Sequence, residues 1–248
     1  MYSEIDTIVV NVLGKNLDVK VIHDEDAQSP RDWDNLGTMA CSHRSYTLGD
    51  IQLKQGDCSE SHYDDLALHA YNEFIREGYD DKYFDSYSGD LNHLGLKRAQ
   101  KWVEKNLICL PLFLMDHSGL SISTTPFSCG WDSGRVGYVF CTKDKARQEL
   151  GVKRLTQAHI EQIKASLKAE VSVYDDYLSG STYSYYSDTL GISCGGFFGY
   201  NHEKSGLIEH ATSDCLWHVK RLLKNHFDKL KAQIKHRVPL YQRASLAI

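Results

Sequence analysis

The segment that decides the fold reads Asp116-His117-Ser118-Gly119-Leu120-Ser121-Ile122-Ser123-Thr124-Thr125-Pro126-Phe127-Ser128-Cys129-Gly130-Trp131-Asp132-Ser133-Gly134-Arg135-Val136-Gly137. It joins two apolar runs, residues 108–115 and 136–142, whose composition is typical of buried strands. Residues 120–124 alternate between apolar and polar, which predicts a strand paired with the first run across a turn at 117–119. A simple connector does not need so many aspartate, histidine, arginine and hydroxyl groups, so this segment is also the first candidate for a functional site.

The rest of the chain adds two hairpins and five helices. Strands are predicted at 4–14 and 16–23, and again at 182–187 and 192–198. Helices are predicted at 63–77, 94–106, 143–150, 156–178 and 213–235. Because strands and helices do not alternate strictly, the order favours an α+β fold with a mainly antiparallel sheet, flanking helices and a long C-terminal helix.

Two of these helices have a clear apolar stripe at steps of three and four. In the helix at 156–178 the stripe consists of Ile160, Ile163, Leu167, Val171, Tyr174 and Leu178. In the last helix it consists of Leu216, Val219, Leu223, Phe227, Leu230 and Ile234. Both stripes are predicted to face the core.

The chain has 248 residues, of which 42% are hydrophobic and 25% charged, as in ordinary globular proteins. One domain is predicted over 1–248, with an acidic helical insertion at 57–106 and a basic C-terminal helix and tail at 213–248. No apolar run approaches the roughly 20 residues of a membrane helix, and the first residues do not resemble a signal peptide. We therefore expect a cytoplasmic protein without a membrane partner.

The seven cysteines are odd in number and include no Cys-x-x-Cys pair. This pattern favours reduced, mostly buried thiols over a disulfide framework or a thiolate zinc site. A single catalytic cysteine is the alternative.

The net charge of −5 is unevenly distributed. Residues 57–90 contain ten acids and two basic residues, whereas residues 220–248 contain eight basic residues and one acid. This separation of charge indicates a partner with complementary charge, or self-association of body and tail. In both stretches the alternative is a solvated face without a partner.

Several longer motifs occur together. They are Pro30-Arg31-Asp32-Trp33-Asp34-Asn35-Leu36-Gly37-Thr38-Met39, His43-Arg44, Leu48-Gly49-Asp50, Asp116-His117-Ser118-Gly119, Pro126-Phe127-Ser128-Cys129, Trp131-Asp132-Ser133-Gly134, Tyr174-Asp175, Tyr177-Leu178-Ser179-Gly180 and Phe197-Phe198-Gly199. Across residues 18–55 and 108–200 the chain resembles an uncharacterised family of proteins carried by phages and mobile elements. The resemblance carries over no known activity to this chain. It implies action in the host cytoplasm on a host factor, such as inhibition of a nucleic-acid-targeting defence system of the anti-CRISPR or anti-restriction type.

Two tryptophan–aspartate segments, at 33–37 and 131–134, have similar sequences. One hypothesis places Asp34, Asp116 and Asp132 around Mg²⁺, which prefers carboxylate and water oxygens. His43 or His117 would then be the general base, and Arg44 or Arg135 would bind phosphate, as in a metal-dependent phosphoesterase or nuclease. The alternative is that the aspartates and Asn35 cap turns over packed tryptophans.

A second hypothesis is recognition of a host protein or ribonucleoprotein. The binding residues predicted for it are Trp33, Asn35, Arg44, Trp131, Ser133, Arg135, Tyr79, Tyr83 and Tyr87. The three tyrosines belong to the acidic stretch, which could imitate nucleic acid toward a basic partner. The basic C-terminal helix offers a contact for a nucleic-acid backbone. The oligomeric state is not predicted.

Other signatures are absent from the sequence. Asp116-His117-Ser118 cannot converge as a hydrolytic triad, because adjacent residues do not point to one centre. The glycines at 130–137 lack both the dinucleotide fingerprint and the P-loop lysine, and the twelve histidines lack zinc-ligand spacing.

Overall fold

The computed structural model describes residues 4–53, 61–75, 83, 91–237 and 239. It confirms an α+β fold with two mostly antiparallel sheets and, within the described residues, five α-helices. Contacts divide the chain into a terminal unit, Met1–Ala27 with Gly180–Ile248, and a middle unit, Gln28–Ser179. The organisation as one domain stays a prediction. No helix among the described residues has the length and apolarity needed to cross a bilayer.

The terminal unit contains both predicted hairpins. Its strands are β1 (Glu4–Val12), β2 (Lys15–His23), β8 (Thr182–Ser187) and β9 (Ile192–Phe198), in the antiparallel order β1-β2-β8-β9. Leu13 and Gly14 form the first turn with φ of 51° and 81°. Two consecutive positive φ values match the twist of a two-residue hairpin.

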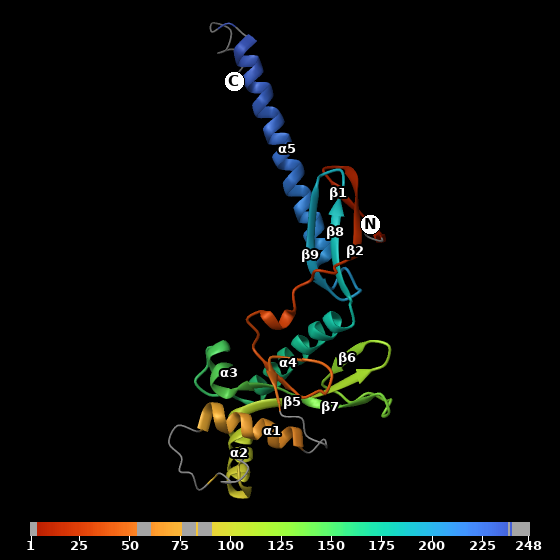
Figure 1. The fold of residues 1–248 in the computed structure, drawn as a ribbon. Coiled ribbons are helices and arrows are strands. Elements are labelled where there is room, and N and C mark those ends of the chain that lie inside the picture. The colour runs from red at the N-terminus through yellow and green to blue at the C-terminus, as the bar shows by residue number, and fades with distance from the viewer. Residues whose placement is uncertain (1–3, 54–60, 76–82, 84–90, 238, 240–248) are drawn as a thin grey trace. The chain divides into compact units, whose positions relative to one another are not determined.

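Helix α5 (Leu207–Arg237) covers this sheet (Figure 1). It buries Leu207, Ala211 and Cys215 against strand residues such as Val19 and Val21. It is also held by Tyr185 of β8, whose hydroxyl donates to Asp214 Oδ2 at 3.0 Å and lies 2.9 Å from His210 Nδ1. Burial raises the pKa of Tyr185, so the phenol stays protonated.

The predicted core stripe of this helix is wrong in its outer part. Leu216 and Val219 are half-buried against the sheet, but Leu223, Phe227, Leu230 and Ile234 are exposed. The reason is length. At 31 residues α5 measures about 47 Å, whereas the strands of 6–9 residues reach at most about 30 Å.

The middle unit has a five-stranded sheet in the order β4-β3-β7-β5-β6. Its strands are β3 (Thr38–Cys41), β4 (Ile51–Gln52), β5 (Leu107–Asp116), β6 (Leu120–Ser123) and β7 (Ser133–Thr142). The β5–β6 hairpin is confirmed, and only β3 and β4 run parallel. Strand β7 begins three residues before the predicted 136, because its ladder with β5 continues as far as Met115 and Ser133.

Helices cover both faces of this sheet (Figure 1). On β7, Val139 and Cys141 face α4 (Gln157–Leu178), while Tyr138 and Phe140 face α1 (Ser61–Ala70) and α2 (His93–Asn106). Successive side chains of a strand point to opposite faces of the sheet, so β7 is buried on both faces. The described part of the acidic 57–106 segment is therefore a layer of the core.

The predicted helices at 94–106 and 156–178 are confirmed. Thr156 caps α4 by accepting from the His159 N–H at 3.3 Å, and the predicted stripe is buried or half-buried. The short helix α3 (Lys143–Glu149) begins after Thr142. The helix predicted at 63–77 changes after Ala70 into a π-helix, η2 (Tyr71–Ile75), and residues 76 and 77 lie outside the described part.

Arg31 joins three distant segments of the middle unit. Arg31 is the middle residue of the 3-10 turn η1 (Pro30–Asp32), and its side chain is only 6% exposed. It donates to Gly37 O at 2.8 Å and to both oxygens of Asp50 at 3.0 and 2.5 Å, and it lies 3.5 Å from Glu170 on α4. Asp50 in turn accepts from the Met39 N–H at 2.7 Å. The segments 30–39 and 48–50 thus form a clamp that fixes β3 against α4.

A substitution at Gly137 tests the close approach of β3 and β7. A Cβ at this position, where φ is 156°, would lie 1.9 Å from Ala40 O. Gly137→Ala is therefore expected to lower the free energy of unfolding in urea by about 3 kcal/mol.

The matched control lies in the same strand. Gly134 has nothing within 4 Å of an added Cβ, so Gly134→Ala should leave the urea midpoint almost unchanged. Equal effects of the two substitutions would contradict this packing of β3 on β7.

Candidate functional site

The register of β3 on β7 decides which predicted site residues meet. Thr38 pairs with Phe140 and Cys41 with Gly137. The first residue of β3 therefore lies near the C-terminal end of β7, and its last residue lies toward the N-terminal end of β7. The chain after β3, which carries His43, then runs next to the start of β7.

The same register separates the two tryptophan–aspartate segments. Trp33 precedes β3, whose first residue pairs near the C-terminal end of β7. Trp131 lies just before the N-terminal end of β7. Ten residues of strand span roughly 30 Å. The hypothesis that Asp34 joins Asp116 and Asp132 requires the two segments to meet, but the antiparallel pairing of β3 with β7 brings them to opposite ends of β7.

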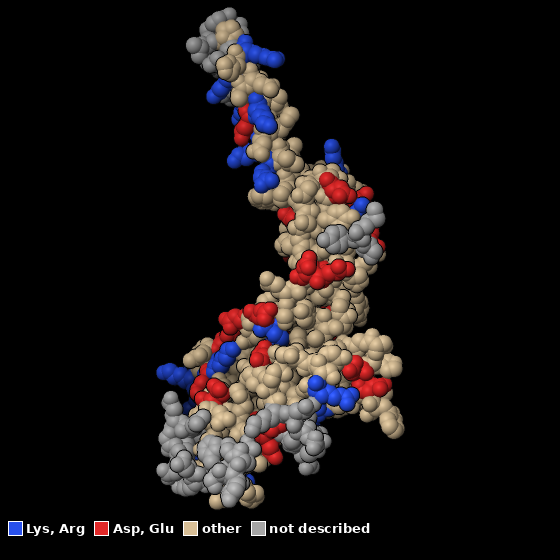
Figure 2. Space-filling model, in the orientation of Figure 1, with Lys and Arg blue, Asp and Glu red and all other residues tan. Residues whose placement is uncertain are grey.

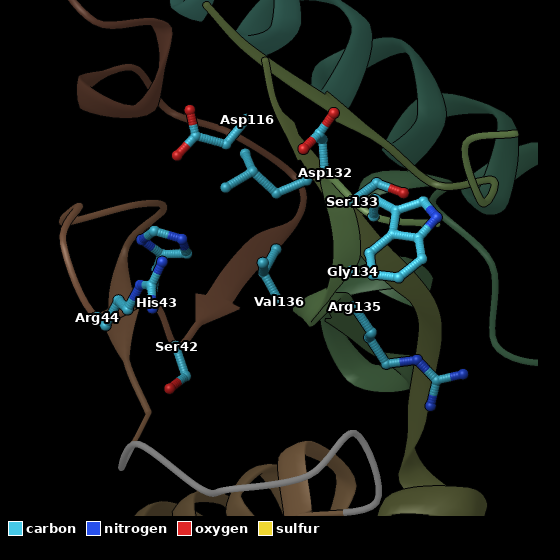
Figure 3. Close-up of a pocket in the computed structure, with 11 residues that line it drawn as sticks. Ser42, His43, Arg44, Asp116, Asp132, Ser133, Gly134, Arg135 and Val136 are labelled. Carbon is cyan, nitrogen blue, oxygen red and sulfur yellow. The ribbon is translucent and has the colours of Figure 1, made fainter. Parts of the chain in front are cut away.

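A pocket of about 420 Å³ lies where β3 ends and β7 begins, here called the strand-end pocket (Figure 3). It contains seven residues that the sequence singled out and four further ones. Its lining residues are Ser42, His43, Arg44, Leu114, Asp116, Trp131, Asp132, Ser133, Gly134, Arg135 and Val136.

Asp116, at the end of β5, and Asp132, just before β7, meet through their backbones. The Asp116 N–H donates to Asp132 O at 2.8 Å, one step beyond the pairing of Met115 with Ser133. Asp132 Oδ2 also lies 3.0 Å from His117 Nδ1. A carboxylate at Nδ1 orients the ring with Nε2 free to accept a proton, so His117, which does not line the pocket, forms an aspartate–histidine pair with Asp132, which does.

His43 is held differently. Its Nδ1 accepts from the N–H groups of Ser45 and Tyr46, both at 3.2 Å, and its ring stacks on Tyr46. Nδ1 is thus occupied as an acceptor, and Nε2 carries the proton of the neutral ring. His43 is therefore arranged to donate a hydrogen bond, and His117 fits the role of general base better.

The two arginines also differ. Arg135 donates to the Tyr138 hydroxyl at 3.2 Å, and its guanidinium lies over the rings of Phe113 and Tyr138. Arg44 is exposed, and Figure 3 shows it beside His43, across Val136 from Ser133. A ligand in this pocket would meet positive and negative groups from different strands.

Trp131 is the most exposed large hydrophobic residue of the described chain, at 97%. Two residues before it lies Cys129, which is also exposed and whose thiol donates to Asp132 Oδ2 at 3.8 Å. Ser133 donates from its hydroxyl to Cys129 O and so closes the turn. The loop before β7 therefore has a defined shape while it presents an indole to solvent.

Asp34 and Asn35 line another pocket, together with residues of α3 and α4. The Asn35 side chain donates to Pro30 O at 2.8 Å and Trp33 O at 3.0 Å, which is the turn-capping role. Asp34 does not join Asp116 and Asp132. Among the described residues, no group of three or more His, Cys, Asp or Glu side chains converges to hold a metal ion, so the three-aspartate site is not formed.

Of the three predicted tyrosines, only Tyr83 is described. Its hydroxyl accepts from Arg98 Nη1 at 2.7 Å, and the Arg98 guanidinium lies 5.2 Å from its ring centre. Tyr79 and Tyr87 lie outside the described residues. The acidic tyrosine surface stays a prediction.

Sequence reasoning missed the residues that hold the site in place. Asp175 Oδ1 accepts from Ser121 Oγ at 2.8 Å and from the Ile122 N–H at 2.7 Å, which attaches β6 to α4. Arg31, Asp50 and Glu170 are the others. The motifs containing Arg31, Asp50 and Asp175 were visible, but their roles depend on contacts between residues far apart in sequence.

The chain was compared with models of protein families, with curated proteins and with solved structures, and none matches it.

Cysteine reactivity tests the exposure of the loop before β7. Burial raises the pKa of Cys41 and Cys109 to about 12 and that of Cys141 to about 11. Burial also raises the pKa of Cys194 and Cys215. Because thiolates react, iodoacetamide on the native protein should modify Cys129 first among the six described cysteines, as measured by peptide mass spectrometry. Earlier labelling of Cys41 or Cys215 would contradict the placement of this loop.

Proposed function

We propose that this protein acts by binding a host macromolecule through the strand-end pocket and Trp131. The single observation that supports it is an almost fully exposed indole on a turn closed by hydrogen bonds. Leaving such a large apolar group in water gains nothing for folding. Tryptophan and arginine are the residues that most often dominate binding energy at interfaces.

The surroundings of Trp131 suit a mixed-charge protein interface. Arg44 and Arg135 lie on one strand-end surface with Asp116 and Asp132. An apolar anchor inside a rim of both charges gives affinity from the anchor and specificity from the rim. Nucleic acid alone fits less well, because the two carboxylates repel phosphate.

The identity of the target comes from the motif resemblance. It supports a phage or mobile-element accessory protein that acts in the host cytoplasm. Its target in this proposal is a protein or ribonucleoprotein of a nucleic-acid-targeting defence system, which it inhibits by occupancy.

A metal-dependent phosphoesterase is the second candidate. The observation in its favour is that Asp116 and Asp132 share a pocket with Arg44, and that His117 is oriented by Asp132. Mg²⁺ is often held by one or two carboxylates together with water and substrate phosphate. Asp116 and Asp132 would hold the ion, His117 would take the proton from the attacking water, and Arg44 would bind the phosphate.

Two tryptophan substitutions, one of them a control, test the binding proposal. Trp131→Ala should reduce capture of the host target from a lysate of cells that carry the element at least about 30-fold, as expected for an anchor residue. The matched control is Trp33→Ala, since Trp33 is exposed too, at 49%, but lies at the other end of β7. Capture is measured by quantitative mass spectrometry of the bound proteins.

Two outcomes would overturn this proposal. One is loss of capture in Trp33→Ala with Trp131→Ala unaffected. The other is Mg²⁺-dependent hydrolysis of bis-p-nitrophenyl phosphate that Asp132→Asn abolishes and Asp34→Asn leaves intact, which would establish the phosphoesterase instead.

A further inference from the structure

The outer part of α5 has an apolar face that nothing in the described chain covers. Leu223, Phe227, Leu230 and Ile234 are between 38% and 57% exposed. The helix is anchored by Leu207, Ala211 and Cys215 on the sheet, and Figure 1 shows that it continues past the sheet as a regular helix. The uncovered face is therefore presented in a fixed conformation.

The spacing of this face follows a heptad. Leu216, Leu223 and Leu230 are seven residues apart, and so are Lys220, Phe227 and Ile234. The steps between the two series alternate between four residues (Leu216 to Lys220) and three residues (Lys220 to Leu223). This is the a/d pattern of a coiled coil, in which the leucines occupy d, the other series occupies a, and the a and d residues together form the seam. Of the three residues at a, Ile234 is β-branched, and a β-branched residue at a with leucine at d favours a parallel coiled coil of two helices.

The charged residues beside this seam favour a parallel partner helix over an antiparallel one. Lys224 and Lys231 lie on one side, at e, while Val219, His226 and Gln233 lie on the other side, at g. In a parallel pair each e residue faces a g residue of the other helix, so the lysines meet neutral side chains. In an antiparallel pair lysine would face lysine.

We propose that α5 from Lys220 to Arg237, the part beyond the sheet contacts of Leu216 and Val219, pairs with the same segment of a second copy of this chain as a parallel two-stranded coiled coil. The segment contains 18 residues, about two and a half heptads and about 27 Å of helix. Lys220 occupies one a position, where a polar residue fixes the register at a cost in stability.

Salt dependence separates this proposal from nucleic-acid binding. Residues 216–237 contain seven basic residues and one acid, and Figure 2 shows the basic side chains along the outer part of α5. Two such helices repel each other, so added salt should strengthen the dimer by screening. Binding to a phosphate backbone instead weakens with salt.

Substitutions at the neighbouring residues Leu223 and Leu222 test whether the seam forms a dimer. In sedimentation equilibrium of the full chain, the wild type should dimerise, and more tightly in about 1 M than in about 0.1 M NaCl. Leu223→Asp should weaken the dimer at least about 30-fold, since each dimer loses two seam leucines. Leu222→Asp is the matched control, because Leu222 is also exposed, at 52%, but lies off the seam.

Two further variants check the seam and its direction. Lys220→Leu should tighten the dimer by removing a pair of like charges. Leu230→Cys should form a disulfide between copies above the wild-type background, and Leu222→Cys should not, because only a parallel seam brings two copies of a d residue together.

A chain that is monomeric at both salt concentrations would overturn the proposal. So would equal effects of Leu223→Asp and Leu222→Asp, absence of the Leu230→Cys crosslink, or association that requires added nucleic acid.

Discussion

The buried guanidinium of Arg31 is the interaction on which the middle unit depends. A charge removed from water must be matched by partners with good geometry, and its loss leaves the partners uncompensated. Here the partners are Gly37, Asp50 and Glu170, which come from three separate parts of the chain. The guanidinium thereby fixes the segment before β3, the segment before β4 and helix α4 in one arrangement.

That arrangement determines the site. With β3 fixed, its antiparallel register on β7 brings His43 and Arg44 to the start of β7. The ladder of β7 with β5 brings Asp116 next to Asp132 at the same place. Strand pairing, and not a local motif, thus collects the charged groups around Trp131.

The sequence predicted what local periodicity determines. The stripe of α4, its cap at Thr156 and the hairpins followed from patterns within a few residues. Strands β3 and β4 are too short to show alternation. The similarity of the two tryptophan–aspartate segments was misleading, because register over long separations leaves no local pattern. The stripe of α5 was correctly seen as amphipathic, but amphipathicity does not say what covers it.

The central claim is that the Arg31 clamp serves folding and that Trp131 serves recognition. Urea unfolding of Arg31→Met and Trp131→Ala tests it most directly. The account predicts a loss of about 3 kcal/mol for Arg31→Met and a change within about 0.5 kcal/mol for Trp131→Ala. A destabilisation by Trp131→Ala as large as that by Arg31→Met would show that the indole is part of the core, and would contradict the account.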